Sequence, residues 1–169
     1  GEVLCDFSNL DKYIDLCFKH KINKEINLFG LVGNWDAFKF GSPLEDYKDA
    51  IRINYYDEDR KVFDYIKDKT DFAKYLNLLF SHLESRGLLD ITKIIVDEPD
   101  NIEVFNENVD FIKTSSGNKD IKYKCAIHHQ EFFEKCEINI ENLSLNTCEL
   151  INNINNLDEI KKKLEDRGG

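Results

Sequence analysis

The stretch Lys93-Ile94-Ile95-Val96-Asp97-Glu98-Pro99 decides the predicted fold. Its apolar run, rich in β-branched residues, predicts a buried strand of a parallel sheet. Asp97 and Glu98 are costly to bury as charges, and Pro99 cannot continue a strand ladder. We therefore expect both carboxylates where the strand leaves the sheet. Ligands bind at the carboxyl ends of strands in α/β folds, so the stretch predicts a carboxylate pair at the mouth of a site.

The composition favours a single domain and disfavours two classes of partner. The chain has 169 residues, enough to bury a core, and a net charge of -10. This acidic balance disfavours nucleic acid and anionic membrane surfaces, because both attract basic patches. No apolar run approaches the roughly 20 residues of a membrane-spanning helix. We expect no nucleic acid, no membrane and no cofactor.

The five cysteines are scattered along the chain, and their pattern predicts reduced thiols. Their number is odd and no CxxC or CxxH pair occurs, so neither a zinc site nor a disulfide framework is indicated. Reduced, mostly buried thiols lean toward a cytoplasmic location. The sequence contains no methionine, from which we expect it to be a piece of a longer protein.

Helices and strands alternate along the predicted chain. Residues 71–86 carry one apolar stripe at helical spacing, with Thr70 or Asp71 as the expected N-cap and Gly87 just past the end. The other predicted elements are a helix at 9–20, a strand at 25–32, a helix at 102–111, a strand at 121–128, a strand within 136–145 and a helix at 157–164. Strands separated by helices in this way are expected to be mainly parallel.

This alternation predicts an α/β fold, a partial (β/α)8 TIM-barrel-like domain with about four mainly parallel strands. A complete barrel takes about 250 residues. An open doubly wound sheet is the alternative, but the chain carries no glycine-rich phosphate loop. Residues 51–56 and 61–66 partly alternate around 57–60 and predict a β-hairpin insertion, which we expect to project over the strand ends as part of a lid.

Candidate sugar-binding residues occur in the predicted hairpin and near two further strand ends. Trp35 would stack on the apolar face of a sugar ring and Asn34 would bond its hydroxyls, or the two belong to a turn with a packing aromatic. Tyr55 is either a substrate contact or part of the packing of the hairpin. His128 ends the strand at 121–128 and either bonds a sugar hydroxyl or is tied to local backbone.

Several motifs follow one another in a characteristic order. They are Gly33-Asn34-Trp35, Phe40-Gly41-Ser42-Pro43, Asp49-Ala50-Ile51-Arg52, Tyr55-Tyr56-Asp57, Tyr75, Leu79-Phe80-Ser81-His82-Leu83, Gly87 and Asp97-Glu98-Pro99. This order resembles the catalytic barrel of glycoside hydrolase family 123 and its bacterial relatives. The resemblance covers most of the chain, and it is strongest from Phe29 to Pro99 and weaker after Gln130.

The resemblance implies a carbohydrate substrate and a reaction. That family consists of retaining, substrate-assisted β-N-acetylgalactosaminidases that use an adjacent Asp-Glu pair. Carried over, Asp97 would hold and polarise the 2-acetamido group, and Glu98 would be the general acid/base. The sequence departs from the family in lacking the remaining strands and an N-terminal β-sandwich domain, so the sugar contacts of those parts are missing.

The adjacent positions of the two carboxylates also suit this chemistry independently of the resemblance. A retaining glycosidase with its own nucleophile needs two carboxylates about 5 Å apart that flank the bond. Asp97 and Glu98 are neighbours and reach the same side of a sugar, which suits attack by the substrate's own acetamide oxygen. Close carboxylates repel, so one of them, by our hypothesis Glu98, keeps its proton to a higher pH than normal.

Two other functions stay open at this point. A catalytically silent carbohydrate-binding or assembly module derived from such a barrel is the first, and its open sheet edges would allow a homodimer. The second is a metal-dependent hydrolase that uses Asp97, Glu98, His128 and His129. Adjacent histidines of a strand point to opposite faces, which disfavours a shared ion, and we expect no metal ligand.

Overall fold

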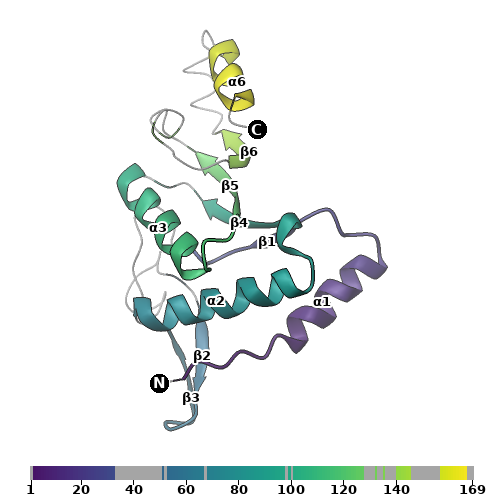
Figure 1. Cartoon of the computed structure of the whole chain (residues 1–169), viewed down its shortest axis with the longest axis vertical. Coiled ribbons are helices and arrows are strands. Elements are labelled where there is room, and N and C mark those ends of the chain that lie inside the picture. The colour runs from purple at the N-terminus through teal and green to yellow at the C-terminus, as the bar shows by residue number, and fades with distance from the viewer. Residues whose placement is uncertain are drawn as a thin grey trace.

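The computed structural model describes residues 2–32, 51, 53–66, 68–97, 99, 101–127, 132, 135, 140–145 and 157–166. Its centre is a parallel sheet of four strands. They are β1 (Ile26–Leu28), β4 (Thr92–Asp97), β5 (Lys122–Ile127) and β6 (Ile140–Leu145), which lie side by side in that order (Figure 1). The predicted α/β class and the parallel strands are thereby confirmed.

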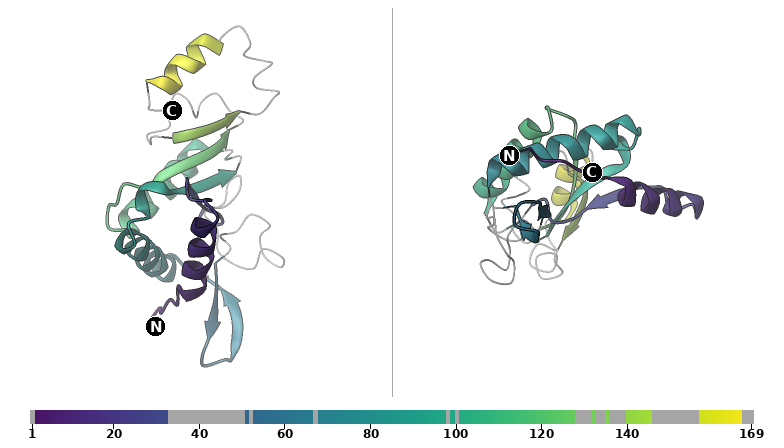
Figure 2. Two further views of the ribbon diagram at one scale, coloured as in Figure 1. Left: turned by 90° about the vertical axis from the view of Figure 1, so that its right-hand side faces the viewer. Right: turned by 90° about the horizontal axis from the view of Figure 1, so that it is seen from below.

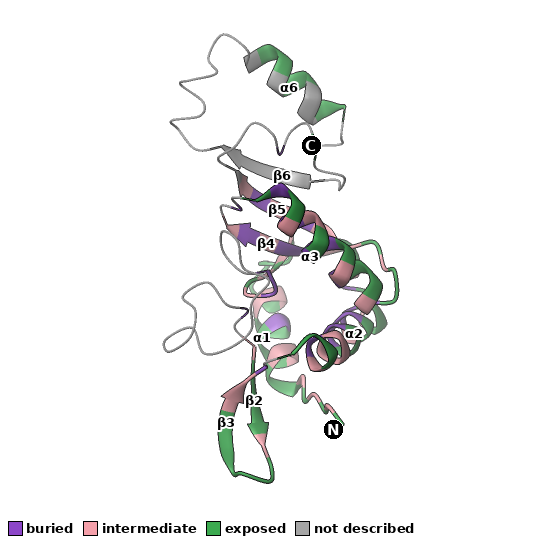
Figure 3. Cartoon of the chain, turned by 90° about the vertical axis from the view of Figure 1, so that its left-hand side faces the viewer, coloured by how far each residue is buried: buried purple, intermediate pink, exposed green. Residues whose placement is uncertain are grey.

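Two helices cover one face of this sheet. α2 (Lys69–Ser85) precedes β4, and α3 (Ile102–Ser115) connects β4 to β5 (Figure 2). Their apolar stripes supply Phe72, Leu76, Leu79, Phe80, Leu83, Phe105, Val109 and Ile112 to the core, together with Ile94, Val96, Tyr123 and Cys125 from the strands. The buried residues gather between the helices and the sheet (Figure 3). The core therefore lies on the helical side of the sheet.

The ends of α2 show which of the predicted caps is used. The Asp68 carboxylate caps the helix, because its Oδ1 accepts a hydrogen bond from the backbone N–H of Asp71 at 2.9 Å. Thr70 and Asp71, the predicted caps, lie inside the first turn instead. Gly87 has a φ of +68° and ends the helix as predicted. A short 3-10 helix, η1 (Leu89–Ile91), then leads into β4.

Two other elements differ in length from their predictions. β1 is shorter than the predicted strand at 25–32, because Gly30 adopts a φ of +84° and turns the chain out of the extended conformation. α3 runs about one turn beyond the predicted end at residue 111. Its start was predicted correctly, since Asn101 Oδ1 accepts from the N–H groups of Glu103 and Val104 at 2.9 and 3.0 Å.

The predicted hairpin is present. β2 (Asn54–Asp57) pairs antiparallel with β3 (Val62–Tyr65). Asp57 stabilises the turn by accepting hydrogen bonds from the backbone N–H groups of Asp59 and Arg60 at 3.0 and 2.8 Å. The alternating pattern of the sequence therefore predicted this element correctly.

The direction of the hairpin was predicted wrongly. Rather than covering the carboxyl ends of the parallel strands, it extends beyond the β1 side of the sheet, at the opposite end of the molecule from α6 (Leu157–Glu165) (Figure 1). Ile51 and Ile66 at its base are buried in the core. The hairpin is thus anchored in the core at its base and extends away from β4, β5 and β6 (Figure 1).

Ion pairs and hydrogen bonds hold α1 (Ser8–Lys19) against the C-terminal end of α2. Asp11 Oδ1 lies 2.7 Å from His82 Nε2 and 2.6 Å from the guanidinium of Arg86, which also contacts Asp15 at 2.5 Å. The ring of Phe7 stacks on the His82 imidazole with 4.6 Å between centroids. His82 is thus a half-buried structural residue, as its place beside the α2 stripe predicts.

Three cysteines lie in the described part of the chain, and all three are free thiols. Cys125 is buried in β5 as predicted, whereas Cys5 and Cys17 are half-buried. Burial raises the pKa of the Cys5 thiol. Among the described helices, none combines the length and the apolar character needed to cross a membrane.

Candidate functional site

The site is built from the carboxyl end of β4. Asp97 is the last residue of this strand, is half-buried, and is paired in register with Ala126 of β5. Val96 before it and Pro99 after it are buried, so the strand leaves the sheet between two packed residues. The predicted position of Asp97 at a strand end is confirmed. β4 lies inside the sheet, between β1 and β5, but β1 ends level with Ile94, so the strand neighbour of Asp97 is Ala126 of β5.

Asp97 belongs to the sheet face that the helices leave open. Side chains of a strand alternate between its faces, so Lys93 and Ile95 share the face of Asp97, whereas Ile94 and Val96 point to the core. The register extends this face to Asn27, Lys122, Lys124 and Ala126 on the neighbouring strands. This face is polar, although both faces of a parallel sheet are usually apolar.

A carboxylate organises the amino-terminal part of this polar face. Glu25, just before β1, accepts hydrogen bonds from Lys124 Nζ at 2.8 Å and from Asn27 Nδ2 at 3.0 Å. Its other oxygen lies 3.3 Å from Lys93 Nζ. Lys93 is 9% exposed, so its ammonium is largely withdrawn from water. Glu25 thus ties together three side chains from three adjacent strands.

These contacts keep Glu25 ionised. The hydrogen bond from Lys124, followed by those from Asn27 and Lys93, lowers the pKa of Glu25 to about 2. Two lysines and one carboxylate leave this cluster with one net positive charge near neutral pH. The face therefore carries a positive cluster at its amino end and the Asp97 carboxylate at its carboxyl end.

The structure places two of the six predicted site residues. Besides Asp97, it places Tyr55 in β2, where the side chain is 43% exposed. Because β2 belongs to the hairpin, which extends away from β4, Tyr55 and Asp97 are not brought together (Figure 1). The other four predicted residues, Asn34, Trp35, Glu98 and His128, lie outside the described residues.

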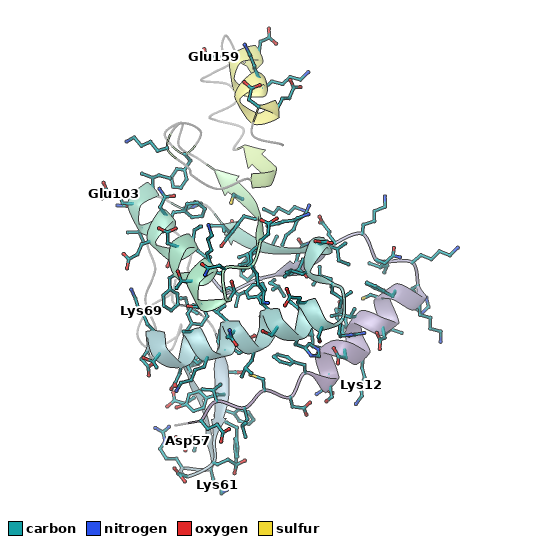
Figure 4. All side chains as sticks on the ribbon, viewed as in Figure 1. Lys12, Asp57, Lys61, Lys69, Glu103 and Glu159 are labelled. Atoms are coloured by element: carbon teal, nitrogen blue, oxygen red, sulfur yellow. The ribbon has the colours of Figure 1, made fainter. Side chains whose placement is uncertain are left out.

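The aromatic residues of the hairpin pack on one another. The rings of Tyr56 and Phe63 face each other across the two strands, with 5.1 Å between their centroids. Tyr55 lies opposite Asp64 on the other face of the hairpin. The ion pairs of the hairpin turn lie at the tip, where Figure 4 labels Asp57 and Lys61. Packing within the hairpin, one of the two roles predicted for Tyr55, is thus observed for Tyr56 and Phe63.

No group of three or more histidine, cysteine, aspartate or glutamate side chains suited to a metal ion occurs within the described ranges. Of the four residues in the metal-dependent alternative, only Asp97 belongs to those ranges. The described part of the site is the Asp97 carboxylate, and the cluster of Glu25, Lys93 and Lys124 lies toward the amino end of the same sheet face. Such a site can accept a hydrogen bond from a ligand amide and can stabilise a developing positive charge.

Sequence reasoning missed the role of Glu25 and of the two lysines. Glu25 and Lys124 are 99 positions apart, and only the parallel register of three strands brings them to one face. The available signal was alternation within the strands. Lys122 and Lys124 are polar residues two positions apart in β5, and Lys93 is a charged residue next to the apolar run of β4.

Comparison with known proteins shows which family the chain belongs to. No curated protein matches the chain. The model of the family described as glycoside hydrolase 123, catalytic domain, matches residues 1–167, which is nearly the whole chain. The chain belongs to the glycoside hydrolase 123 catalytic domain family.

Proposed function

We propose that the protein removes terminal β-linked N-acetylhexosamine, N-acetylgalactosamine by preference, with retention of configuration. The observation that carries the proposal is the position of Asp97 at the carboxyl end of β4 in a chain of this family. Asp97 accepts a hydrogen bond from the acetamide N–H and stabilises the positive charge that forms beside it. Glu98, the next residue in the sequence, is the general acid/base.

The reaction proceeds in two steps. In the first, the acetamide oxygen of the substrate attacks the anomeric carbon while Glu98 donates a proton to the glycosidic oxygen, so that this bond breaks and the alcohol leaves. The product is a cyclic oxazolinium ion held by Asp97. In the second, water gives a proton to the Glu98 carboxylate and attacks the anomeric carbon, which reopens the ring. Two inversions at this carbon give net retention.

The sheet supports a barrel-like scaffold for this site. Within the sheet, the described strands follow one another in the same order as in the sequence, β1-β4-β5-β6. A doubly wound sheet reverses its order at a switch point, and no described strand does so. We propose that the four strands are part of a (β/α)8 barrel, which would place the polar face on the inside. Trp35, Asn34 and His128 would then contribute sugar contacts from the same end.

Hydrolysis of an aryl N-acetyl-β-galactosaminide tests the proposal directly. We expect the wild-type protein to release the aryl alcohol, and Glu98→Gln to lower kcat by about a hundredfold or more, because general acid/base catalysis contributes roughly 100- to 10,000-fold. The basic limb of the pH–rate profile should vanish in Glu98→Gln. Glu107→Gln is the matched control, since Glu107 forms only an exposed ion pair with Lys69 on the surface.

Silence of the folded wild-type protein on both galacto- and gluco-configured substrates would contradict the proposal. An unchanged pH–rate profile in Glu98→Gln would contradict the role of Glu98 alone. A second measurement uses the leaving group: an aryl group of low pKa needs little protonation, so it should restore much of the first step in Glu98→Gln.

A further inference from the structure

Lys124 is placed so that it has two possible partners. It lies on the same sheet face as Asp97, and its strand position is level with Ile95, two residues before Asp97. Parallel strands lie about 4.8 Å apart and rise about 3.3 Å per residue, so such diagonal neighbours are roughly 8 Å apart, within reach of a long side chain. The ammonium of Lys124 contacts Glu25 instead, which precedes the first residue of β1. The side chain therefore extends across β4 toward the amino ends of the strands.

The reach of Lys124 would conflict with the proposed role of Asp97. An ammonium on the Asp97 carboxylate would neutralise the charge that stabilises the oxazolinium ion and would occupy the oxygen that accepts the acetamide N–H. Lys93 poses no such conflict, because it lies four residues before Asp97 on the same strand. Lys122 is level with Lys93 and equally remote from Asp97. Lys124 is thus the described lysine of this face nearest in register to Asp97.

We propose that Glu25 is a positioning residue, which holds the Lys124 ammonium at the amino end of the sheet and keeps it off the Asp97 carboxylate. The inference rests on the proposed function, because it assigns Glu25 a role in that same site. In this role Glu25 acts through Lys124 and not on the substrate. Its low pKa keeps it ionised across the pH range in which a glycosidase works, so its hold on Lys124 is constant.

The kinetic test first removes the charge of Glu25 and then also removes the ammonium of Lys124. Glu25→Gln should lower kcat/KM about tenfold and move the acidic limb of the pH–rate profile to lower pH, because a nearby ammonium lowers the pKa of a carboxylate. Lys124→Met alone should remain close to wild type. The double variant Glu25→Gln/Lys124→Met should recover the activity and the pH profile of Lys124→Met. A merely structural role of Glu25 predicts no such recovery.

A second readout does not depend on hydrolysis. Carbon-13 NMR titration of the Asp97 carboxyl group should show a pKa about one pH unit lower in Glu25→Gln than in the wild type, and a return in the double variant. If the wild type does not hydrolyse the aryl substrate, the proposed function fails and this titration decides the inference separately. An equal Asp97 pKa in wild type and Glu25→Gln overturns it.

Two further variants guard the interpretation. If Glu25→Gln does not fold, Glu25→Asp takes its place. This variant keeps the charge but withdraws the carboxylate by one methylene, so it should lower the pKa of Asp97 by less than the shift expected for Glu25→Gln. Glu107→Gln removes an exposed carboxylate of the same kind and should leave the Asp97 titration unchanged. A decrease of the Asp97 pKa in Glu107→Gln would show a general charge effect and would overturn the positioning role.

Discussion

At the scale of single residues, Glu25 makes the stability of the protein depend on pH. Its folded pKa of about 2 lies below the value of about 4.3 in an unfolded chain. A lowered carboxyl pKa stabilises the folded state fully above the unfolded value, and this contribution is lost as the pH falls toward the folded value. The melting temperature of Glu25→Gln should therefore lie below that of the wild type at pH 6, and the gap should narrow as the pH approaches 2.

Thermal unfolding followed by circular dichroism between pH 6 and pH 2.5 measures this gap. Glu107→Gln should show little difference from the wild type at any pH, because exposed ion pairs contribute little. A gap for Glu25→Gln that stays constant over this range would contradict the ionised cluster with Lys93 and Lys124.

What the sequence reveals at this scale depends on how local the signal is. Asp97 could be placed at a strand end because Pro99 and the preceding apolar run are its immediate neighbours. The contact between Asp11 and His82 spans 71 positions, and neither residue carries a sign of the other. Lys124 and Glu25 likewise meet only through strand register, so their contact was not predictable from the residues alone.

At the scale of elements, the start of α2 offers a test of helix capping. Asp68, Thr70 and Asp71 are all residue types that cap helices, and the sequence does not distinguish them. Asp68 has the extended conformation of a capping residue and bonds the N–H of Asp71. Asp68→Ala should lower the free energy of unfolding by about 1 kcal/mol, with a small effect from Thr70→Ala. Urea unfolding of both variants measures the difference.

An equal loss of unfolding free energy in Asp68→Ala and Thr70→Ala would contradict Asp68 as the cap.

The hairpin shows a related limit of prediction. Its alternating residues and the turn at Asp57 predicted two paired strands correctly, because both signals are local. Its direction carries no such local signal: Ile51 and Ile66 at its base are buried in the core, and the sequence does not show how that base sits on the sheet.

At the scale of the whole molecule, the two outer strands of the described sheet bear on how the protein assembles. Among the described strands, β1 and β6 each pair with one neighbour, and they lie on opposite sides of the sheet (Figure 2). Unpaired strand edges favour association with another chain. We propose a homodimer that pairs these edges. Sedimentation velocity should then give about twice the chain mass of 19.8 kDa, and a clean monomer at all concentrations would contradict edge pairing.

Binding of the N-acetylgalactosamine thiazoline, a stable analogue of the oxazolinium ion, tests the role of Asp97 most directly. Calorimetry should show binding to the wild type, weakened about tenfold to a hundredfold in Asp97→Asn, because a hydrogen bond to a charged group is worth roughly 1.5–3 kcal/mol. Glu107→Gln should bind as the wild type does. Equal affinity in Asp97→Asn, or no binding by the folded wild-type protein, would contradict a substrate-assisted site at the end of β4.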